Sequence, residues 1–336
     1  MRYNPHISLI CIPVNIFHCI VLTRKSMRDS SINLIIAAVA IADVLALSEA
    51  IEAKLDSFLS NLRPCLMPNS YIYTFTNNSI EVLCNFSRRC STWLSFCTAL
   101  IRTLVVRNPL DPRFCELSEP KSAFKVIVLV VLMSSAFALF DASGYKIIEE
   151  AFDAYLPCLI NVTQLTYEPR LSDLFTMNDE LLYKIYSALD SIVSKGIPCL
   201  LFPIITFLLI VEIRKADTNR RKVSCSAKSD KSSGRTTKLV LVLTITFFAA
   251  EFPLGVVTAL QAFFHAITGM RWILIYFSYI FTLLLSLNTS THMIVCLLMS
   301  SQYRSAAESV IFCGYTSKQK MSRTSVITVS SVVITQ

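Results

Sequence analysis

The chain has 336 residues, of which 54% are hydrophobic and only 16% are charged. Soluble domains carry about 25% charged residues, so this composition points to lipid as the main solvent. The six glycines form neither GxGxxG nor GxxxxGK[ST], which excludes the common nucleotide-binding loops. The sequence also lacks HExxH and the nucleophile elbow GxSxG, which argues against the common hydrolase classes.

Seven apolar stretches are long enough to cross a bilayer, because a membrane helix needs about 20 mostly apolar residues. The third stretch is the most polar, since it contains Arg88 and Arg89. A short amphipathic helix at 302–312 and a disordered tail at 313–336 are expected to follow the last stretch. The sequence therefore predicts an all-α membrane protein in which residues 1–312 form one seven-helix bundle. The predicted spans are residues 7–23, 33–53, 77–106, 123–141, 187–212, 239–264 and 272–299.

Basic residues are concentrated in alternate connections between these spans. The segments 24–32, 107–122 and 213–238 are rich in lysine and arginine. The segment 142–182 is instead acidic. Positive charge marks the cytoplasmic side, so we expect the N-terminus outside and the C-terminus inside. This topology accounts for the net charge of +8 without any binding of nucleic acid. The composition of residues 214–236 is typical of a flexible loop.

Ionisable side chains lie inside several predicted spans, where a charge costs about 2.5–3.5 kcal/mol on insertion scales. They are Asp43, Arg88, Arg89 and Glu251. Such side chains are expected to face the interior of the bundle and to find partners there. Two interpretations stay open at this point: the charges hold the bundle together, or they form a ligand cavity and a switch.

Several motifs, in order and at consistent spacing, resemble one receptor family over nearly the whole chain. The motifs are Asn15 within PVNIFHCIVLTRKSMR, Asp43 at the end of AIAD, RRCSTWLSFCTALIRTLVVRNP, KGIPCLLFPIITFLLIVEIRK, TTKLVLVLTITFFAAEFPLG and LNTSTHMIVCLLMSSQYR. The chain resembles rhodopsin-like G-protein-coupled receptors, most closely the nematode Srw-type serpentine chemoreceptors, which are related to FMRFamide-type peptide receptors. The resemblance implies a receptor that binds an extracellular peptide or small-molecule ligand and activates a heterotrimeric G protein.

The resemblance implies contacts with the G protein at the inner surface. Arg102 stands where these receptors carry a shared arginine, and Pro109 follows seven residues later, as it does in the wider class. Arg214 and Lys238, which flank the most basic connection, are expected to join this contact. The acidic residue that usually precedes the arginine is replaced by Ile101, so we expect the usual resting lock on Arg102 to be absent.

The resemblance also implies a switch at the floor of the ligand cavity. Arg88, Trp93 and Glu251 are expected there, with Pro253 as the hinge of the sixth span. Because Arg88 and Glu251 carry opposite charges, we predict that they form an ion pair. Two departures affect the switch: Glu251 replaces a common tryptophan, and residues 292–296 replace the usual NPxxY pattern.

Two further sites are implied by the resemblance. Asp43, Ser91 and Asn288 match positions that hold a sodium ion in many such receptors. No other cofactor or metal is expected. Cys65 and Cys158 are expected to form an extracellular disulfide bond.

Modification and location follow from the expected topology. Asn161 begins a sequon for N-glycosylation on a predicted outer loop. Cys313 follows the amphipathic helix and is a candidate for palmitoylation, with an unmodified cysteine as an equal alternative. The resemblance implies a multi-pass protein of the plasma membrane, in particular that of sensory neurons.

Three alternatives to a working receptor stay open on the sequence alone. Charges inside spans also suit an ion- or proton-coupled transporter, although the sequence shows no internal repeat. A membrane enzyme is the second alternative. A decayed or truncated receptor is the third, because only 14 residues precede Asn15 and the seventh-span motif is altered. The sequence specifies neither the ligand nor the subtype of G protein.

Overall fold

The structure is a computed structural model, and it describes residues 5–62, 70–108, 111–153, 163–223, 230–264 and 267–312. Within these residues the chain is mostly helical, which confirms the predicted α-helical class. Four helical segments of the described part are long and apolar enough to cross a bilayer: Ser31–Glu52, Pro120–Ser143, Asp173–Ala216 and Thr268–Leu298. The segments His6–Leu22 and Phe247–Gln261 are shorter apolar helices.

The first two predicted spans form three helices. Helix α1 is Pro5–Leu22, α2 is Ser31–Ala46 and α3 is Ser48–Leu62. The second predicted span is therefore divided at Leu47. The hydroxyl of Ser48 donates to a backbone carbonyl of the preceding turn at 2.7 Å, a bond that competes with the regular helical pattern and bends helices.

Helix α4, Tyr71–Arg107, contains the third predicted span and is 37 residues long. Its first turn is capped by Ser70, whose side chain accepts a hydrogen bond from a backbone amide. The short helix α5, Pro112–Cys115, and the turn η1, Glu116–Ser118, connect α4 to α6, Pro120–Ser143. Both α5 and α6 begin with proline, which suits the first helical position because it needs no amide donor there.

A β-hairpin lies in the segment 142–182, for which the sequence predicted only a loop. Strand β1, Tyr145–Asp153, pairs antiparallel with β2, Thr163–Leu171. The register runs from Tyr145 opposite Leu171 to Asp153 opposite Thr163. The Thr74 hydroxyl of α4 donates to the Tyr167 carbonyl at 2.8 Å, so the hairpin is tied to the start of α4.

The fifth predicted span lies within a longer helical segment. Helix α7, Asp173–Ser191, continues through a π-turn, η2, Ile192–Gly196, into α8, Ile197–Val223. A π-turn widens the helix locally and rotates the side chains that follow it. The predicted range 187–212 therefore covers only the middle of this segment.

Helix α7 is interrupted near its start. The φ angles of Asn178, Asp179 and Glu180 are +51°, +52° and +61°. Asparagine and aspartate tolerate this left-handed region better than other residues with a β-carbon. The ammonium group of Lys184 donates to the Asp179 carbonyl at 2.8 Å, which supports the turn.

The last third of the chain is also helical. Helix α9 is Asp230–Phe264, α10 is Thr268–Thr289, α11 is Thr291–Met299 and α12 is Ser301–Ile311. The prediction of a flexible loop at 214–236 is wrong for most of its described residues, because α8 and α9 extend into it. Lysine and arginine favour helices, so a basic polar segment can continue a membrane helix into water.

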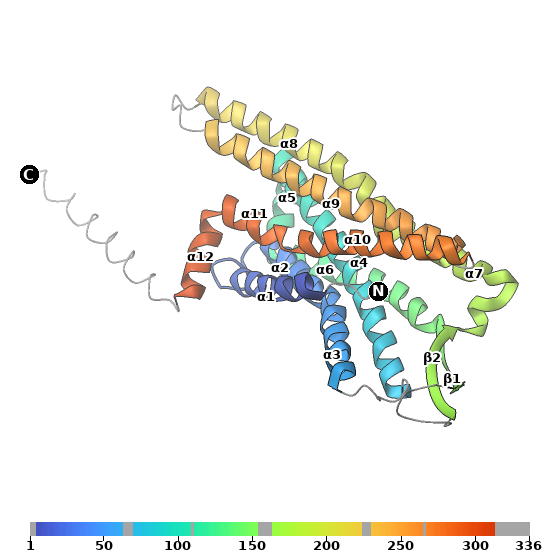
Figure 1. Cartoon of the computed structure of the whole chain (residues 1–336). Helices are drawn as coiled ribbons and strands as arrows, with labels where there is room; N and C mark the ends of the chain where they lie inside the picture. The colour runs from blue at the N-terminus through green and yellow to red at the C-terminus, as the bar shows by residue number, and fades with distance from the viewer. Residues whose placement is uncertain are drawn as a thin grey trace, which may run out of the picture.

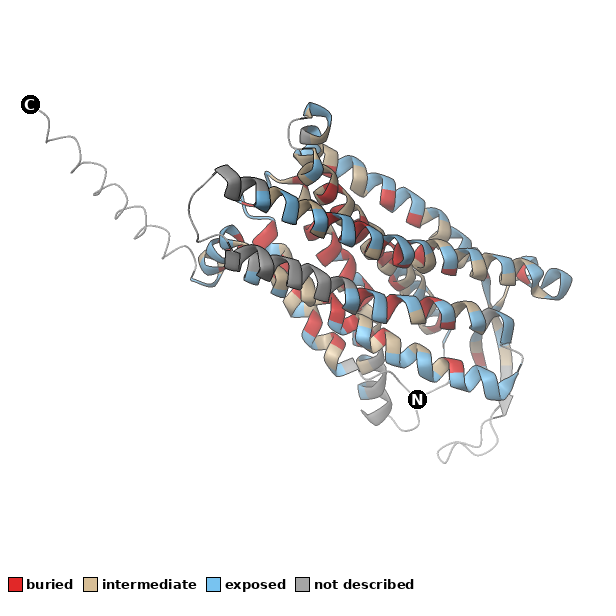
Figure 2. Ribbon diagram, turned by 90° about the horizontal axis from the view of Figure 1, so that it is seen from above, coloured by how far each residue is buried: buried red, intermediate tan, exposed pale blue. Residues whose placement is uncertain are grey.

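Helix α4 occupies the centre of the bundle, where it packs against α2, α6 and α8 (Figure 1). Leu94 packs in a core cluster with Val39 of α2. Phe96 belongs to a second cluster with Phe202 of α8 and Phe247 of α9, whose rings stack with centroids 4.6 Å apart. Buried residues gather along the inward faces of the helices, while the outward faces are exposed (Figure 2). This pattern suits helices whose outer faces contact lipid.

Helix α12 and the β-hairpin lie at opposite ends of the molecule (Figure 1). Tyr303 of α12 is fully buried, and its hydroxyl shares a hydrogen bond with Nδ1 of His18 in α1 at 2.7 Å. Burial raises the pKa of the Tyr303 phenol, so this group is uncharged at neutral pH. The side-chain amide of Gln302 donates to the Ser26 carbonyl at 2.5 Å. These bonds hold α12 against the start of the bundle.

Candidate functional site

A cavity of about 820 Å³ opens near the β-hairpin, between α4, α6, α7 and α9. It is called the hairpin-end cavity below, because the first residue of β1 lines it. Acidic, basic and tyrosine side chains face it together. Its lining residues are Asn85, Arg88, Arg89, Thr92, Asp141, Tyr145, Tyr183, Tyr186, Ser187, Asp190, Ser194, Lys195, Glu251, Leu254, Thr258 and Leu285.

Arg89 is the most highly connected side chain of this cavity, and it is only 3% exposed. Its Nη2 atom lies 2.9 Å from Oδ1 of Asp190 in α7. Its Nε atom donates to the Ser194 hydroxyl at 2.9 Å, and Nη1 donates to the Ser134 carbonyl at 3.1 Å. One guanidinium thus joins α4 to α6, to α7 and to the π-turn.

A second carboxylate completes the surroundings of Arg89. Oδ2 of Asp141 lies 3.5 Å from Nη2 of Arg89. The Tyr186 hydroxyl donates to Oδ1 of Asp141 at 2.8 Å. The guanidinium carbon of Arg89 lies 5.0 Å from the centre of the Phe137 ring, at cation–π distance. Two acids facing one cation are favourable here because hydrogen bonds satisfy the remaining oxygen atoms.

The floor of the cavity connects the π-turn, α4 and α9. The ammonium group of Lys195, in the π-turn, donates to the Thr258 hydroxyl of α9 at 2.7 Å. The Thr92 hydroxyl of α4 donates to Oε1 of Glu251 in α9 at 3.2 Å. Glu251 is buried, so its carboxylate depends on these polar neighbours. Both bonds restrain α9, one on each side of Pro253.

Arg88 has a different ionic partner from the one predicted. Its Nη2 atom lies 3.3 Å from Oε2 of Glu49 in α3, and the two side chains are 25% and 45% exposed. Arg88 and Glu251 do line the same cavity. The predicted Arg88–Glu251 ion pair is corrected accordingly, because Glu49 approaches Arg88 from α3 and Thr92 binds Glu251.

Trp93 and Pro253 belong to the packing around the cavity. Trp93 is not among the residues that line the hairpin-end cavity, so its predicted place at the cavity floor stays a prediction. Its ring meets Phe96 edge to face, with centroids 5.6 Å apart, because its position on α4 turns it toward the core clusters. Pro253 is half-buried within α9, where it removes one backbone hydrogen bond and weakens the helix locally.

A smaller pocket lies deeper in the bundle, around Asp43. The Ser91 hydroxyl donates to Oδ1 of Asp43 at 2.5 Å, so two of the three residues predicted for a sodium site meet. Asn288 is buried but lies outside this lining, and its Oδ1 accepts from the Thr291 hydroxyl. Hydroxyl groups of Thr282, Ser286 and Thr289 line the pocket in its place.

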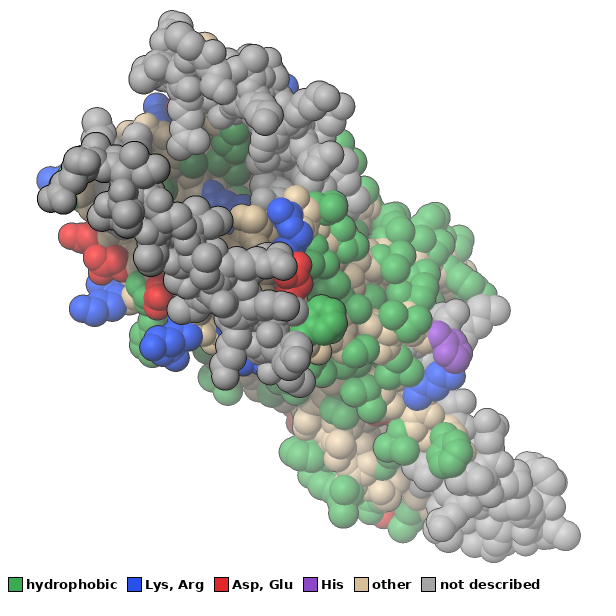
Figure 3. All heavy atoms as spheres, turned by 90° about the vertical axis from the view of Figure 1, so that its left-hand side faces the viewer, with side chains coloured by type: hydrophobic (Ala, Val, Ile, Leu, Met, Phe, Trp, Pro, Cys, Tyr) green, Lys and Arg blue, Asp and Glu red, His purple; other side chains and the backbone are tan. Residues whose placement is uncertain are grey.

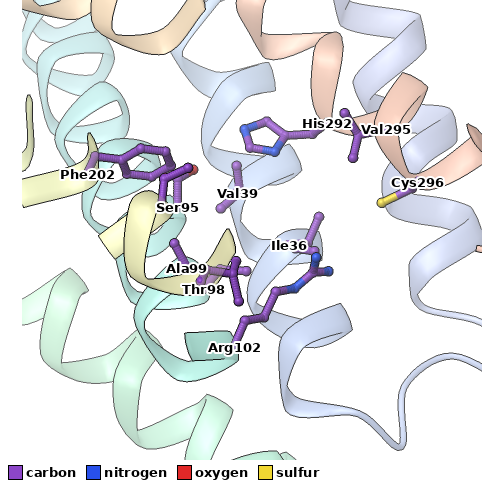
Figure 4. A pocket seen from close by; sticks show the side chains of 12 residues that line it. Ile36, Val39, Ser95, Thr98, Ala99, Arg102, Phe202, His292, Val295 and Cys296 are labelled. Atoms are coloured by element: carbon purple, nitrogen blue, oxygen red, sulfur yellow. The ribbon is translucent and has the colours of Figure 1, made fainter. Parts of the chain in front are cut away.

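Arg102 lies in another cavity, of about 660 Å³ (Figure 4). This cavity is far from the hairpin, because α4 meets the hairpin near its start and Arg102 lies near its end. It is called the Arg102 cavity below. Within the described part of the chain, Arg102 forms no hydrogen bond or ion pair. The lining residues are Ile36, Val39, Ser95, Thr98, Ala99, Arg102, Phe202, Thr206, Leu209, His292, Val295 and Cys296.

The chain matches the family described as "Serpentine type 7TM GPCR chemoreceptor Srw" over residues 2–314. The chain belongs to this family. The resemblance seen in the sequence is thus confirmed, and the Srw protein is a multi-pass membrane protein of a receptor family rather than an enzyme. The match gives no support to the transporter alternative.

Three curated proteins are also similar to this Srw protein. The sex peptide receptor of Drosophila melanogaster is 24% identical, over 76% of this chain and 59% of its own length. The G-protein coupled receptor dmsr-1 of Caenorhabditis elegans is 26% identical, over 62% of this chain and 41% of its own length. The FMRFamide receptor of D. melanogaster is 23% identical, over 86% of this chain and 49% of its own length. The chain thus spans about half the length of these relatives.

Several predicted site residues of the Srw protein are not in the regions just described. Arg214 is an exposed residue of α8. Lys238 lies on α9, but its side chain is outside the described part. Five further predicted residues lie outside the described residues: Pro109, Cys65, Cys158, Asn161 and Cys313. The predicted coupling role, disulfide bond, glycosylation and palmitoylation of these residues stay predictions.

The sequence analysis missed most partners of Arg89. Asp141 and Asp190 stand at the ends of predicted spans, where a charged residue is unremarkable by itself. Lys195 lies inside the predicted fifth span, and its charge was the signal that could have identified it. Tyr186 carries no charge and gave no signal.

Proposed function

We propose that this Srw protein binds an extracellular ligand in the hairpin-end cavity and activates a heterotrimeric G protein at the opposite end. The observation that carries the proposal is the placement of both cavities on α4. Arg89 and Thr92 face one cavity, and Arg102 faces the other. From Arg89 to Arg102 the helix rises roughly 20 Å at 1.5 Å per residue, which is most of the hydrocarbon core.

The orientation that this function needs is supported by charge. The hairpin end then faces outward and the Arg102 end faces the cytoplasm of the cell, in the plasma membrane. Basic side chains are exposed on this side of the molecule, with acidic side chains among them (Figure 3). The end of α8, the start of α9 and the connection between them contain the densest basic stretch of the chain, 213–238, and the positive-inside rule supports a cytoplasmic position for it.

A peptide is the ligand class that the cavity and the relatives favour together. Two of the relatives are named as receptors for sex peptide and for FMRFamide. The hairpin-end cavity offers carboxylates, cations and tyrosines within one volume of about 820 Å³. A peptide carries backbone donors and acceptors as well as charges, so it can satisfy this mixture. A zwitterionic small molecule is the second candidate, on the same side chains.

Activation in this proposal is an outward swing of α9 about Pro253. A ligand that binds Lys195 or Glu251 competes with their bonds to Thr258 and Thr92, which restrain α9 at rest. Ligand binding therefore shifts the balance between two states by its differential affinity for them. The swing would open the inner end for the G protein, with Arg102 at its centre.

The test is expression of the full chain with a promiscuous G protein, followed by screening with amidated peptides and small zwitterions. We expect a ligand-dependent G-protein response that Lys195→Met weakens, while Arg271→Gln, an exposed change on α10, leaves it unchanged. Surface labelling of each variant controls for folding. A surface-exposed wild type that moves ions or solutes without engaging any G protein would refute the proposal.

A further inference from the structure

The Arg102 cavity contains three polar groups that lack partners in the described part of the chain. They are the guanidinium of Arg102, the hydroxyl of Ser95 and the imidazole of His292. Arg102 extends from α4 and His292 from α11 toward the same space (Figure 4). Ser95 is buried and Arg102 and His292 are half-buried, so a cation and two further polar groups are placed to bind an occupant of this space.

The described residues that line this cavity do not balance the charge of Arg102. None of its described lining residues is acidic. The residue before Arg102 is Ile101, and the nearby acid Glu212 lies 3.9 Å from Arg107 instead. A cation in such surroundings is stabilised by an anion from outside, because the described lining residues supply none.

The other residues that line the cavity indicate which kind of molecule carries the anionic group. Ile36, Val39, Phe202, Leu209 and Val295 present apolar surface to the same space. A bare inorganic ion would leave this surface in contact with water. An ion on an apolar chain would cover it, at a gain of roughly 25 cal/mol for each Å² removed from water.

We propose that the Arg102 cavity binds an amphiphilic anion, a carboxylate or phosphate group on an apolar chain. The anionic oxygens pair with Arg102 and accept from Ser95, and the chain lies along Phe202 and Leu209. Such a ligand supplies the negative charge that Ile101 lacks. It also fills the space into which a G protein would insert, so it stabilises the resting state.

The effect on the resting state rests on the proposed function, but the binding of the anion does not, so the test of binding uses no G protein and no agonist. Full-length protein is purified in a non-ionic detergent, and thermal unfolding is followed with increasing probe concentration. The probes are dodecanoate, dioctanoyl phosphatidate, dodecanol and inorganic phosphate. The first two represent a free fatty acid and a membrane lipid. Dodecanol keeps the apolar chain without the charge, and phosphate keeps the charge without the chain.

We expect dodecanoate or dioctanoyl phosphatidate to raise the Tm, with the stronger of the two identifying the source. We expect their binding to weaken at least about tenfold in Arg102→Gln, the size of one charge-assisted contact. Arg107→Gln is the matched control, because this arginine lies five positions further along α4 and is 60% exposed. The Arg107→Gln variant should bind the anionic probe as tightly as the wild type does.

A second variant tests the same cavity in case Arg102→Gln does not fold. Ala99→Leu keeps the charge and fills the cavity, so it should also abolish the shift. The proposal is overturned if no anionic probe shifts the wild type, if dodecanol acts as strongly as dodecanoate, or if phosphate alone accounts for the shift. It is also overturned if both cavity variants bind the probe as well as Arg107→Gln.

Discussion

Replacing Arg89 by alanine would leave the carboxylates of Asp190 and Asp141 facing each other without the cation between them. The same change removes hydrogen bonds to the Ser194 hydroxyl and to the Ser134 carbonyl. Four contacts from α6, α7 and the π-turn would be lost in one step. We expect the hairpin-end half of the bundle to loosen, because these contacts connect elements that are distant in sequence.

The stability that Arg89→Ala loses can be worked out from the burial of Arg89 and its two acidic partners. The Arg89 side chain is 3% exposed, and those of Asp141 and Asp190 are 19% and 22% exposed. Removing one partner of such a buried pair costs about 3–5 kcal/mol. The cation–π contact with Phe137 adds about 1–2 kcal/mol, although it is not independent of the ion pairs. We therefore expect Arg89→Ala to lose about 3–5 kcal/mol of stability.

The neighbouring Arg88→Ala is the matched control. Its pair with Glu49 is 25% and 45% exposed, so solvent screening reduces it to about 0–1 kcal/mol. Thermal unfolding of purified protein and surface expression in cells would compare the two variants. A double-mutant cycle of Arg89→Ala with Asp190→Ala should show strong coupling. Equal losses for both arginines, or additivity in the cycle, would refute the reasoning.

Three further changes test other contacts. Tyr303→Phe removes the hydrogen bond to His18 and should lower the free energy of unfolding by about 1–3 kcal/mol. We expect a lower Tm and faster proteolysis of the chain after α12, and unchanged proteolysis would contradict the docking role of this bond. Asp43→Asn should abolish a rise of the Tm when sodium chloride replaces choline chloride, and a sodium effect that persists would exclude this pocket as the ion site. Pro253→Ala should reduce the ligand-dependent G-protein response at equal surface expression, and an unchanged response would remove Pro253 as the hinge.

The apolar helices could be predicted from the sequence because lipid imposes a strong signal. The predicted range 123–141 lies inside α6, Pro120–Ser143, and the range 272–299 covers most of α10 and α11. Their outward faces carry large apolar side chains such as Leu129 and Ile280, which are exposed in the bundle. A side chain that must face lipid is apolar whatever its neighbours are, so no tertiary information is needed.

The polar parts could not be predicted in this way. Residues 181–186 and 213–223 are helical although they carry no lipid signal, because helix propensity and continuity extend the spans into water. The β-hairpin at 145–171 depends on pairing between strands and on the bond from Thr74 to its backbone. Such pairing depends on tertiary context, which a single sequence does not reveal.

The two adjacent arginines show where inference from the sequence reached its limit. One residue along a helix is a rotation of about 100° around the axis, so Arg88 and Arg89 leave α4 in different directions, although both line the hairpin-end cavity. The sequence indicated that both charges were costly in a membrane, but not which one faced the interior. The structure buries Arg89 against Asp190, which lies in a different predicted span. It leaves Arg88 at the rim of the cavity, paired with Glu49. Arg89 is thus compensated by acids, while the described residues that line the cavity of Arg102 include none. The ion pairs of Arg89 hold the helices of the hairpin end together, whereas Arg102 is available to pair with an anion, and this difference separates the two arginines of α4.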